Sequence, residues 1–376
     1  MPQLFNLIKS KTLNMHKKVS VLIMGIIISA CLQSFQLRPA AETYMVTTIA
    51  GNGEDRWIDG PAGKNSLSGE LGNLTVDASG NIYVMDFTNL RKISPDGTVN
   101  TLFGSLIYGD DGNPKEIGRQ IEKGARGIVI DKNGNIFVSE KNGHAIRKIT
   151  NEEKVELYAG NTDYSGADDG DAASAEFKSP KDMCIDKSGA IYLIDNYHKV
   201  RKISADGKKV STLAGNDNGA DFKPGTGKAA SLKDIGGIAV DSKGNVYVSQ
   251  PDINCILRVS PVGAVTVFAG DPVVTNGFTK DGAGKLARFL RPGAIACGPD
   301  DNIYVADSRK IRKITPAGVV TTIAGASKDG DSVGGFRDGD GTKALFSSFD
   351  GIACDAAGNI YVSDIGNRRV RKLSKQ

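Results

Sequence analysis

The chain has 376 residues, 40% of them hydrophobic and 24% charged, so it can bury a sizeable core and is not an intrinsically disordered protein. Its 46 glycines, beside many Asp, Asn and Ser residues, favour β structure with frequent turns. The net charge of +4 comes from four lysines before residue 19, and the rest of the chain has 43 basic and 43 acidic residues. We therefore expect no nucleic-acid partner, because bulk charge supplies no attraction to phosphate.

The N-terminal segment has the pattern of an export signal. The basic residues 16–18 precede an uncharged apolar run over residues 19–30. This run is too short to cross a bilayer comfortably as a helix, which takes about 20 residues. Residues 28–31, Ile-Ser-Ala-Cys, resemble the bacterial lipobox, in which the cysteine becomes the lipidated first residue of the mature chain.

This resemblance predicts a signal peptide over residues 1–31, with Met15 as an alternative start, and lipidation at Cys31. A tether over residues 32–44 would follow. The alternative is an ordinary signal peptide that is cut near residues 40–41. In either case we expect export, and with the lipid anchor we expect a place in a bacterial cell envelope, at the outer membrane or facing the periplasm.

From residue 46 onward, the sequence repeats one unit with a spacing of 54 to 57 residues. Each copy has four short apolar stretches between turns that are rich in Gly, Asn and Asp. The second stretch, of the type Ile-Tyr-Val, follows Asn81, Asn135, Ala190, Asn245, Asn302 and Asn359. Alternating β-branched and aromatic residues between such turns predict four antiparallel strands per unit. Four-stranded sheets repeated in this way are typical of β-propeller blades.

The number of stretches predicts a closed ring. The first three occur six times, and the last copy of the third ends at Leu373. The fourth follows them only five times, and its sixth copy stands at residues 46–51, ahead of the first unit. It is expected to complete the last blade. The ring is then closed, and no blade is left with an unpaired strand edge. We therefore predict an all-β fold over residues 45–376: a six-bladed propeller of four-stranded antiparallel blades, closed by an N-terminal strand.

Recurring charges accompany the strands. Five of the six third stretches contain an Arg-Lys pair, such as Arg147-Lys148. The second stretches end in Asp86, Glu140, Asp195, Gln250, Asp307 and Asp364. A basic belt for phosphate or acidic lipid is one interpretation, but pairing between these acids and the basic residues is favoured, because both recur at fixed positions of the unit.

Cysteines and histidines do not form a metal or redox motif in this sequence. No two cysteines have the C-x-x-C spacing, and Cys184, Cys297 and Cys354 occupy positions where other copies have Val, Ile or Ala. Small buried side chains are the favoured interpretation for these three. His144 and His198 fall in equivalent turns and are too few for a zinc site, so we assign no metal ligand.

Residues 361–372, Tyr-Val-Ser-Asp-Ile-Gly-Asn-Arg-Arg-Val-Arg-Lys, resemble the NHL repeat, whose pattern is Tyr-hydrophobic-x-Asp-x-Gly-Asn-x-Arg-Ile/Val. Residues 139–149 follow the same pattern, and the likeness extends over all six units. The resemblance implies an NHL-type propeller. It also implies binding of proteins or glycans through one face, although propellers of this kind include several unrelated enzymes.

The connections from each fourth stretch to the next first stretch have about 20 residues, far above the usual 4 to 6. Because strands alternate in direction, all of them should emerge on one face, which we take as the candidate functional surface. Their common pattern is Asp-Gly, small residues and then a large apolar residue, as in residues 169–177, 281–289 and 338–346. Calcium binding is one interpretation. We favour a turn in which Asp caps a short helical segment and Phe fills the gap between blades.

Polar residues just before the first stretches should lie at the mouth of the central channel. They are Asn73, Arg126, Lys181, Asp182, Asp234, Arg291 and Asp350. Propellers of the gluconolactonase class hold a divalent ion there with Glu, Asn and Asp, and Asn73, Asp182 and Asp350 would be the matching residues. Arg126, Lys181 and Arg291 oppose a cation and suit an anionic group instead. No triad or phosphate loop is visible, so we assign no catalytic residue.

The favoured function is an exported, lipid-anchored module that binds or scaffolds an envelope protein or glycan through its loop-rich face. We expect a monomer without a required cofactor, attached to the membrane only by its lipid. An aromatic platform for sugar stacking is not evident from one tryptophan, Trp57, and ten tyrosines. The alternative is a divalent-metal-dependent hydrolase or lyase of the gluconolactonase-like class that acts at the channel mouth.

Overall fold

The computed structural model describes residues 42–104, 107–108, 114–115, 124–218, 221–273, 277–328, 331–332 and 334–376. The predicted signal peptide with Met15 and Cys31, and the tether up to residue 41, lie outside the described residues. Residues Thr43–Gln376 form one compact unit. No helix within the described part of the chain is long and apolar enough to cross a membrane.

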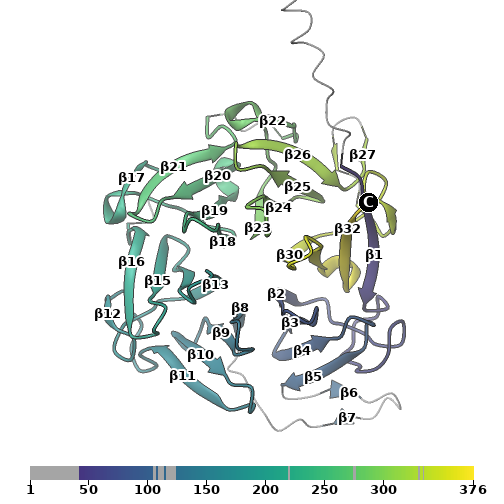
Figure 1. Cartoon of the computed structure of the whole chain (residues 1–376), viewed down its shortest axis with the longest axis horizontal. Coiled ribbons are helices and arrows are strands. Elements are labelled where there is room, and N and C mark those ends of the chain that lie inside the picture. The colour runs from purple at the N-terminus through teal and green to yellow at the C-terminus, as the bar shows by residue number, and fades with distance from the viewer. Residues whose placement is uncertain are drawn as a thin grey trace, which may run out of the picture. The chain divides into compact units, whose positions relative to one another are not determined.

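The unit Thr43–Gln376 consists of six antiparallel sheets arranged as blades around a central axis (Figure 1). The first strands, nearest the axis, are β2 (Leu71–Val76), β8 (Ala125–Ile130), β13 (Pro180–Ile185), β18 (Ile238–Val240), β23 (Pro292–Cys297) and β30 (Phe349–Cys354). The second strands are β3 (Ile82–Asp86), β9 (Ile136–Glu140), β14 (Ile191–Asp195), β19 (Val246–Gln250), β24 (Ile303–Asp307) and β31 (Ile360–Asp364). The third strands are β4 (Asn89–Ile93), β10 (Ala145–Ile149), β15 (Lys199–Ile203), β20 (Cys255–Val259), β25 (Lys310–Ile314) and β32 (Arg369–Lys375). The fourth strands are β5 (Val99–Phe103), β11 (Val155–Gly160), β16 (Lys209–Gly215), β21 (Ala264–Ala269), β26 (Val319–Ala324) and β1 (Tyr44–Ala50).

The N-terminal strand closes the ring. β1 pairs antiparallel with β32, in a register that places Tyr44 opposite Lys375 and Val46 opposite Leu373. It is therefore the fourth strand of the last blade, as its sequence predicts. The all-β, six-bladed propeller with N-terminal closure is confirmed.

Short elements extend this plan. Four blades have a fifth outer strand that the sequence pattern did not predict, namely β12 (Gly170–Asp171), β17 (Gly225–Thr226), β22 (Gly282–Ala283) and β29 (Gly339–Asp340). It forms because the long connection turns back at its glycine and pairs with the fourth strand. Two small hairpins and four single 3-10 turns complete the described elements: β6 (Ile107–Tyr108) with β7 (Pro114–Lys115), β27 (Ser327–Lys328) with β28 (Asp331–Ser332), and η1 (Gly227–Ala229), η2 (Pro251–Ile253), η3 (Gly284–Leu286) and η4 (Ile365–Asn367).

A side-chain motif fixes the turn between the first and second strands. In the last blade, Oδ1 of Asp355 accepts the backbone N–H groups of Ala357 and Asn359 at 3.0 and 2.8 Å. Its Oδ2 accepts the amide of Asn359 at 2.7 Å and the hydroxyl of Tyr361 at 3.0 Å. The carboxylate thus satisfies the turn and ties it to the next strand, which explains why Gly-Asn and Ile-Tyr-Val recur together.

The apolar residue of each long connection packs between blades, as predicted. Phe177, Phe289 and Phe346 are at most 1% exposed. The expectation that an Asp of these connections caps a helical turn is confirmed in the last of them, where Oδ1 of Asp340 accepts the N–H of Thr342 at 2.8 Å, but η3 has no side-chain cap. Instead, the carboxylates of Asp169 and Asp281 face buried guanidinium groups of the third strands, which bind them more strongly than a terminal N–H would.

Candidate functional site

One end of the propeller collects the long connections and the turns between second and third strands, because neighbouring strands alternate in direction. We call this end the loop face and the opposite end, with the tight turns, the turn face. Four aromatic residues of the loop face are strongly exposed. They are Phe87, Tyr164, Phe278 and Phe336, each between 44% and 65% exposed. Half-exposed aromatic rings on a rigid scaffold are common contact residues in binding surfaces.

Asn73 and Asp182 form a bridge at the channel mouth. The amide of Asn73 on β2 donates a hydrogen bond to Oδ1 of Asp182 on β13, which spans the intervening first strand β8. Asp182 also accepts the N–H groups of Met183 at 2.8 Å and of Ile238 on β18 at 3.2 Å. One carboxylate therefore joins three blades at the entrance of the channel.

The protonation of Asp182 is unusual. Its side chain is buried, with 7% exposure, and this burial raises its pKa to about 7. The N–H donors of Met183 and Ile238 and the ammonium of Lys181 oppose the shift, whereas the carboxylate of Asp350 adds to it. Asp182 therefore titrates near neutral pH, where small changes in its surroundings alter its charge.

A second charged group lies beside this bridge. The guanidinium of Arg126 lies 3.5 Å from the carboxylate of Asp350, with 52% and 40% of the two side chains exposed. Burial raises the pKa of Asp350, and Arg126 and Lys181 counteract this shift. The ammonium of Lys181 lies 5.1 Å from the ring centre of Tyr197, a cation–π contact.

Five of the seven predicted mouth residues are thus brought together: Asn73, Arg126, Lys181, Asp182 and Asp350. Asp234 and Arg291 are exposed and have positive φ angles of 48° and 57°. Within the described part of the chain, neither makes a hydrogen bond or ion pair with those five. The backbone N–H of Arg291 instead donates to Asn254 at 2.8 Å, so this residue belongs to the rim of its own blade.

The donor set at the mouth does not suit a divalent cation. Both oxygens of Asp182 already accept hydrogen bonds, and Asp350 faces the guanidinium of Arg126. The Asp-Gly connections suit calcium no better, because Asp169 and Asp281 are ion-paired with arginines at 3.1 and 2.9 Å. No group of three His, Cys, Asp or Glu side chains among the described residues is arranged to hold a metal ion.

Sequence and structure comparisons agree with this architecture. Residues 158–374 match the family model of the Teneurin NHL domain. This chain belongs to the Teneurin NHL domain family. Human Teneurin-4 is 26% identical over 380 residues, which cover 88% of this chain but only 13% of that protein. The chain thus spans a small part of the length of these relatives.

Solved structures resemble this Teneurin-type NHL propeller in fold. An auxiliary nutrient binding protein from Bacteroides thetaiotaomicron matches with a TM-score of 0.64 and 19% identity, over 89% of this chain and 77% of the other. A gluconolactonase from Xanthomonas campestris matches with a TM-score of 0.56 and 13% identity, over 90% and 96%. At these identities the likeness concerns the fold alone.

Below its mouth, the channel of the NHL propeller is lined mostly by apolar residues. The first strands line a cavity of about 140 Å³, whose walls include the thiols of Cys184, Cys297 and Cys354. Burial raises the pKa of the Cys297 thiol to about 12 and also raises the pKa values of the Cys184 and Cys354 thiols well above their usual range. Protonated thiols are poor nucleophiles, so this channel offers no activated cysteine.

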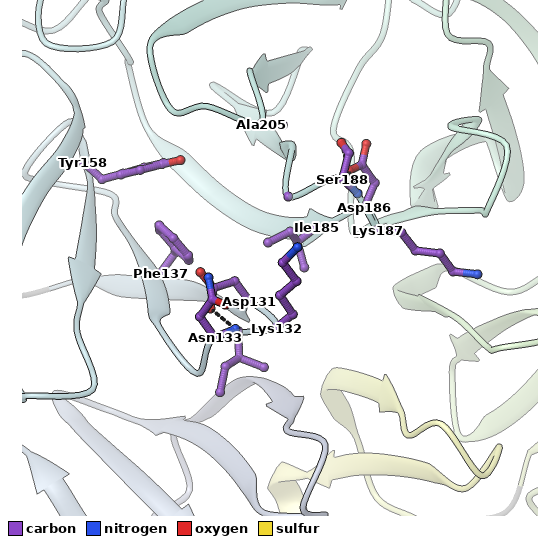
Figure 2. Close-up of a pocket in the computed structure, with 12 residues that line it drawn as sticks. Asp131, Lys132, Asn133, Phe137, Tyr158, Ile185, Asp186, Lys187, Ser188 and Ala205 are labelled. Atoms are coloured by element: carbon purple, nitrogen blue, oxygen red, sulfur yellow. Dashed lines mark hydrogen bonds between the residues drawn. The ribbon is translucent and has the colours of Figure 1, made fainter.

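The turn face of the NHL propeller has a cavity of about 340 Å³ between the second and third blades (Figure 2). It opens where Phe137 replaces the tyrosine that binds the turn Asp in four other blades. Asp131 therefore keeps its bonds to Asn133 and Asn135 but receives no phenol from the second strand. The ring of Tyr158 stands edge-on to Phe137 at 4.7 Å, which moves the hydroxyl to the outer strand.

On the loop face, the NHL propeller has a pocket that sequence reasoning missed. A pocket of about 240 Å³ lies between the first and second blades and is lined by Glu70, Gly72, Met85, Phe87, Thr88, Gly124, Ala125 and Arg126. Phe87 stacks on Trp57, with ring centres 6.0 Å apart and an interplanar angle of 19°. The two rings come from different connections, so no sequence motif links them. The only hint in the sequence is an aromatic residue, Phe87, in a tight turn.

Proposed function

We propose that this protein is an exported, lipid-anchored binding module that holds an envelope protein or glycan on its loop face. The observation that carries the proposal is the contrast between its surfaces. Exposed aromatic rings and the charged groups of Arg126, Lys181 and Asp350 gather on the loop face, whereas at the channel entrance the polar groups of Asn73 and Asp182 are bonded to one another. Such a surface suits recognition more than chemistry.

The envelope location rests on the sequence. The lipobox-like segment that ends at Cys31 supports lipidation there, and the Bacteroides neighbour described as an auxiliary nutrient binding protein fits such a location. Radiolabelled palmitate fed to a Gram-negative host should enter the wild-type protein and not a Cys31→Ser variant. Equal labelling of both proteins contradicts the anchor. We further propose that the module is a monomer. Light scattering of the full chain in detergent will test this proposal.

The binding role is tested with isolated cell envelopes and the full chain. A combined Phe278→Ser and Phe336→Ser variant removes two exposed rings of the loop face and should lower the bound fraction at least tenfold. The matched control, Val262→Ser, changes a residue of the turn face that is 79% exposed and should leave binding unchanged. Equal loss in both variants, or loss in neither, overturns the use of the loop face.

The second candidate is a hydrolase or lyase, favoured by the fold likeness to a gluconolactonase and by two acids with raised pKa values at one mouth. Its test is lactone hydrolysis by the wild type and by Asp182→Ala and Asp350→Ala variants. If neither substitution changes the rate of hydrolysis, this site is not its source. A loss above a hundredfold in both variants would replace the binding proposal.

A further inference from the structure

The pocket between the first two blades is small and has both apolar and polar walls. Met85, 1% exposed, lies on its apolar side, and Glu70 and Arg126 are exposed at its rim. Its volume of about 240 Å³ is below the roughly 300 Å³ at which pockets for drug-sized ligands begin. It therefore suits a ligand of one ring, or the terminal ring of a longer chain.

Phe87 holds its ring at this pocket in a costly backbone conformation. It occupies the first central position of the two-residue turn between β3 and β4, with a φ of 59°, a region that bulky residues rarely adopt. The equivalent turn of the fifth blade has the small residue Ser308 at a φ of 58°. The turn therefore needs no aromatic residue, and strain of this kind concentrates at functional sites.

Trp57 supports the ring of Phe87 from behind. The two rings are nearly parallel, and Phe87 remains 48% exposed, so one part of its surface is free for a ligand. The indole N–H of Trp57 is buried and has no hydrogen-bond partner among the described residues. The stack thus presents a pre-oriented apolar surface at one wall of the pocket.

The polar groups at the rim carry opposite charges. The carboxylate of Glu70 accepts hydrogen bonds, the guanidinium of Arg126 donates them, and Thr88 lines the same pocket. Because the rim offers one acid and one base, it does not select a charged ligand. A ring with an apolar face and several hydroxyl groups at its edge matches both walls. An apolar side chain of a protein would cover these polar groups without bonding them, which is unfavourable.

We propose that this pocket binds one pyranose ring of a neutral glycan, with the C–H face of the sugar on Phe87 and its hydroxyls at Glu70 and Arg126. The proposal rests on the proposed binding function and specifies its ligand class and its site. Trp57 orients Phe87 without touching the sugar, and Phe87 is the residue on which the affinity mainly depends.

The test uses the full chain in a detergent without a sugar head group. The emission of Trp57, the only tryptophan of the chain, is followed while methyl glycosides of glucose, galactose, mannose, N-acetylglucosamine and rhamnose are added. We expect a saturable change with at least one of them. Saturation-transfer NMR on the same glycoside gives a dissociation constant that does not depend on the tryptophan signal.

Three variants assign the site. Phe87→Ser should raise the dissociation constant at least tenfold, and we expect it to fold because Ser308 occupies the equivalent turn position of the fifth blade. Phe87→Tyr should restore binding to within about threefold, because a phenol ring stacks as a benzyl ring does. Tyr158→Phe on the turn face should change nothing.

The outcomes separate this proposal from the proposed function. If no glycoside binds while envelope capture by the loop face persists, the glycan assignment is wrong and the partner is a protein. If a glycoside binds equally well to the Phe87→Ser variant, the site is wrong. If Phe87→Ser abolishes glycoside binding and leaves envelope capture intact, the pocket is a separate sugar site.

Discussion

In four blades, a third-strand arginine is wholly buried between two carboxylates. Arg371, for example, bonds Asp364 of the neighbouring strand at 2.8 Å and Asp338 of the long connection at 2.6 Å. Its guanidinium also stacks on Phe346, at 4.9 Å from the ring centre. Two carboxylates flank Arg91, Arg201 and Arg312 in the same way. These contacts confirm the predicted pairing of the recurring charges and leave these arginines unable to bind phosphate.

The fourth blade shows that the three charges form one unit. It has Leu257 in place of the arginine, Gln250 in place of the strand acid, and Pro224 where other connections have Asp. Leu257 is fully buried among apolar residues, and the amide of Gln250 bonds a backbone carbonyl at 2.7 Å. All three charges are absent together because a buried charge without its partner is costly.

The first prediction follows from this unit. Asp364→Asn leaves the buried guanidinium of Arg371 without its buried counter-charge and should lower the free energy of unfolding by about 3 kcal/mol. Glu152→Gln, which breaks the exposed pair with Lys154, should change it by less than about 0.5 kcal/mol. Urea unfolding of both variants measures the difference, and equal effects would contradict the argument.

The second prediction concerns the pH dependence that Asp182 causes. Because its pKa is raised to about 7 when folded, it favours the folded state below its unfolded pKa, near 4, and this advantage disappears as the pH rises to 7. The total is at most about 4 kcal/mol. Asp182→Asn should therefore lose less stability than the wild type between pH 4 and pH 7, with Lys181 and Asp350 present in both proteins. Parallel pH profiles in urea unfolding would count against the shift.

At the scale of the element, β11 differs from every other outer strand. Val155 on β11 is 42% exposed, whereas the equivalent Val210 and Val320 are at most 2% exposed. In blades three to six the short fifth strand covers this position, and in the first blade Gly60 pairs with Val99. Within the described residues, no strand pairs with the outer edge of β11.

This difference gives the third prediction. Val320→Ala removes buried methyl groups and should cost about 2 kcal/mol of unfolding free energy. Val155→Ala, at the equivalent position of β11, should cost no more than about 0.5 kcal/mol, because its side chain is already half exposed. A large cost at Val155 would show that another part of the chain covers this edge.

At the scale of the whole molecule, stability depends on the pairing of the two ends of the domain. β1 supplies Tyr44 and Val46 to the core between the last two blades, where they are 4% and 0% exposed. Removal of this strand would also expose the backbone edge of β32.

The fourth prediction tests this closure by truncation. A chain that begins at residue 51 should melt about 10 °C lower than the wild type, or more, because it loses a strand and its buried side chains. A chain that begins at residue 43 keeps β1 and should melt as the wild type does. Circular dichroism at increasing temperature measures both. Equal melting of the two truncated chains would show that closure by β1 is dispensable.

The sequence by itself determined the blade count, the strand order and the closure by residues 46–51. These features follow from local patterns that repeat six times, such as alternating side chains and Asp-x-x-Gly-Asn turns, so each copy supports the others. The pairing of recurring acids with recurring arginines could be inferred in the same way, since the partners lie on adjacent strands of one blade.

Only the tertiary structure decided which residues of different blades meet. The bridge between Asn73 and Asp182 spans 109 positions, and the stack of Trp57 on Phe87 joins two connections that share no motif. The fifth strands and the role of Asp169 were also beyond the pattern, because they depend on where a long connection turns back onto its blade. Side chains that occur once have no repeat to reveal them, and their contacts depend on the rotation that each blade makes about the common axis.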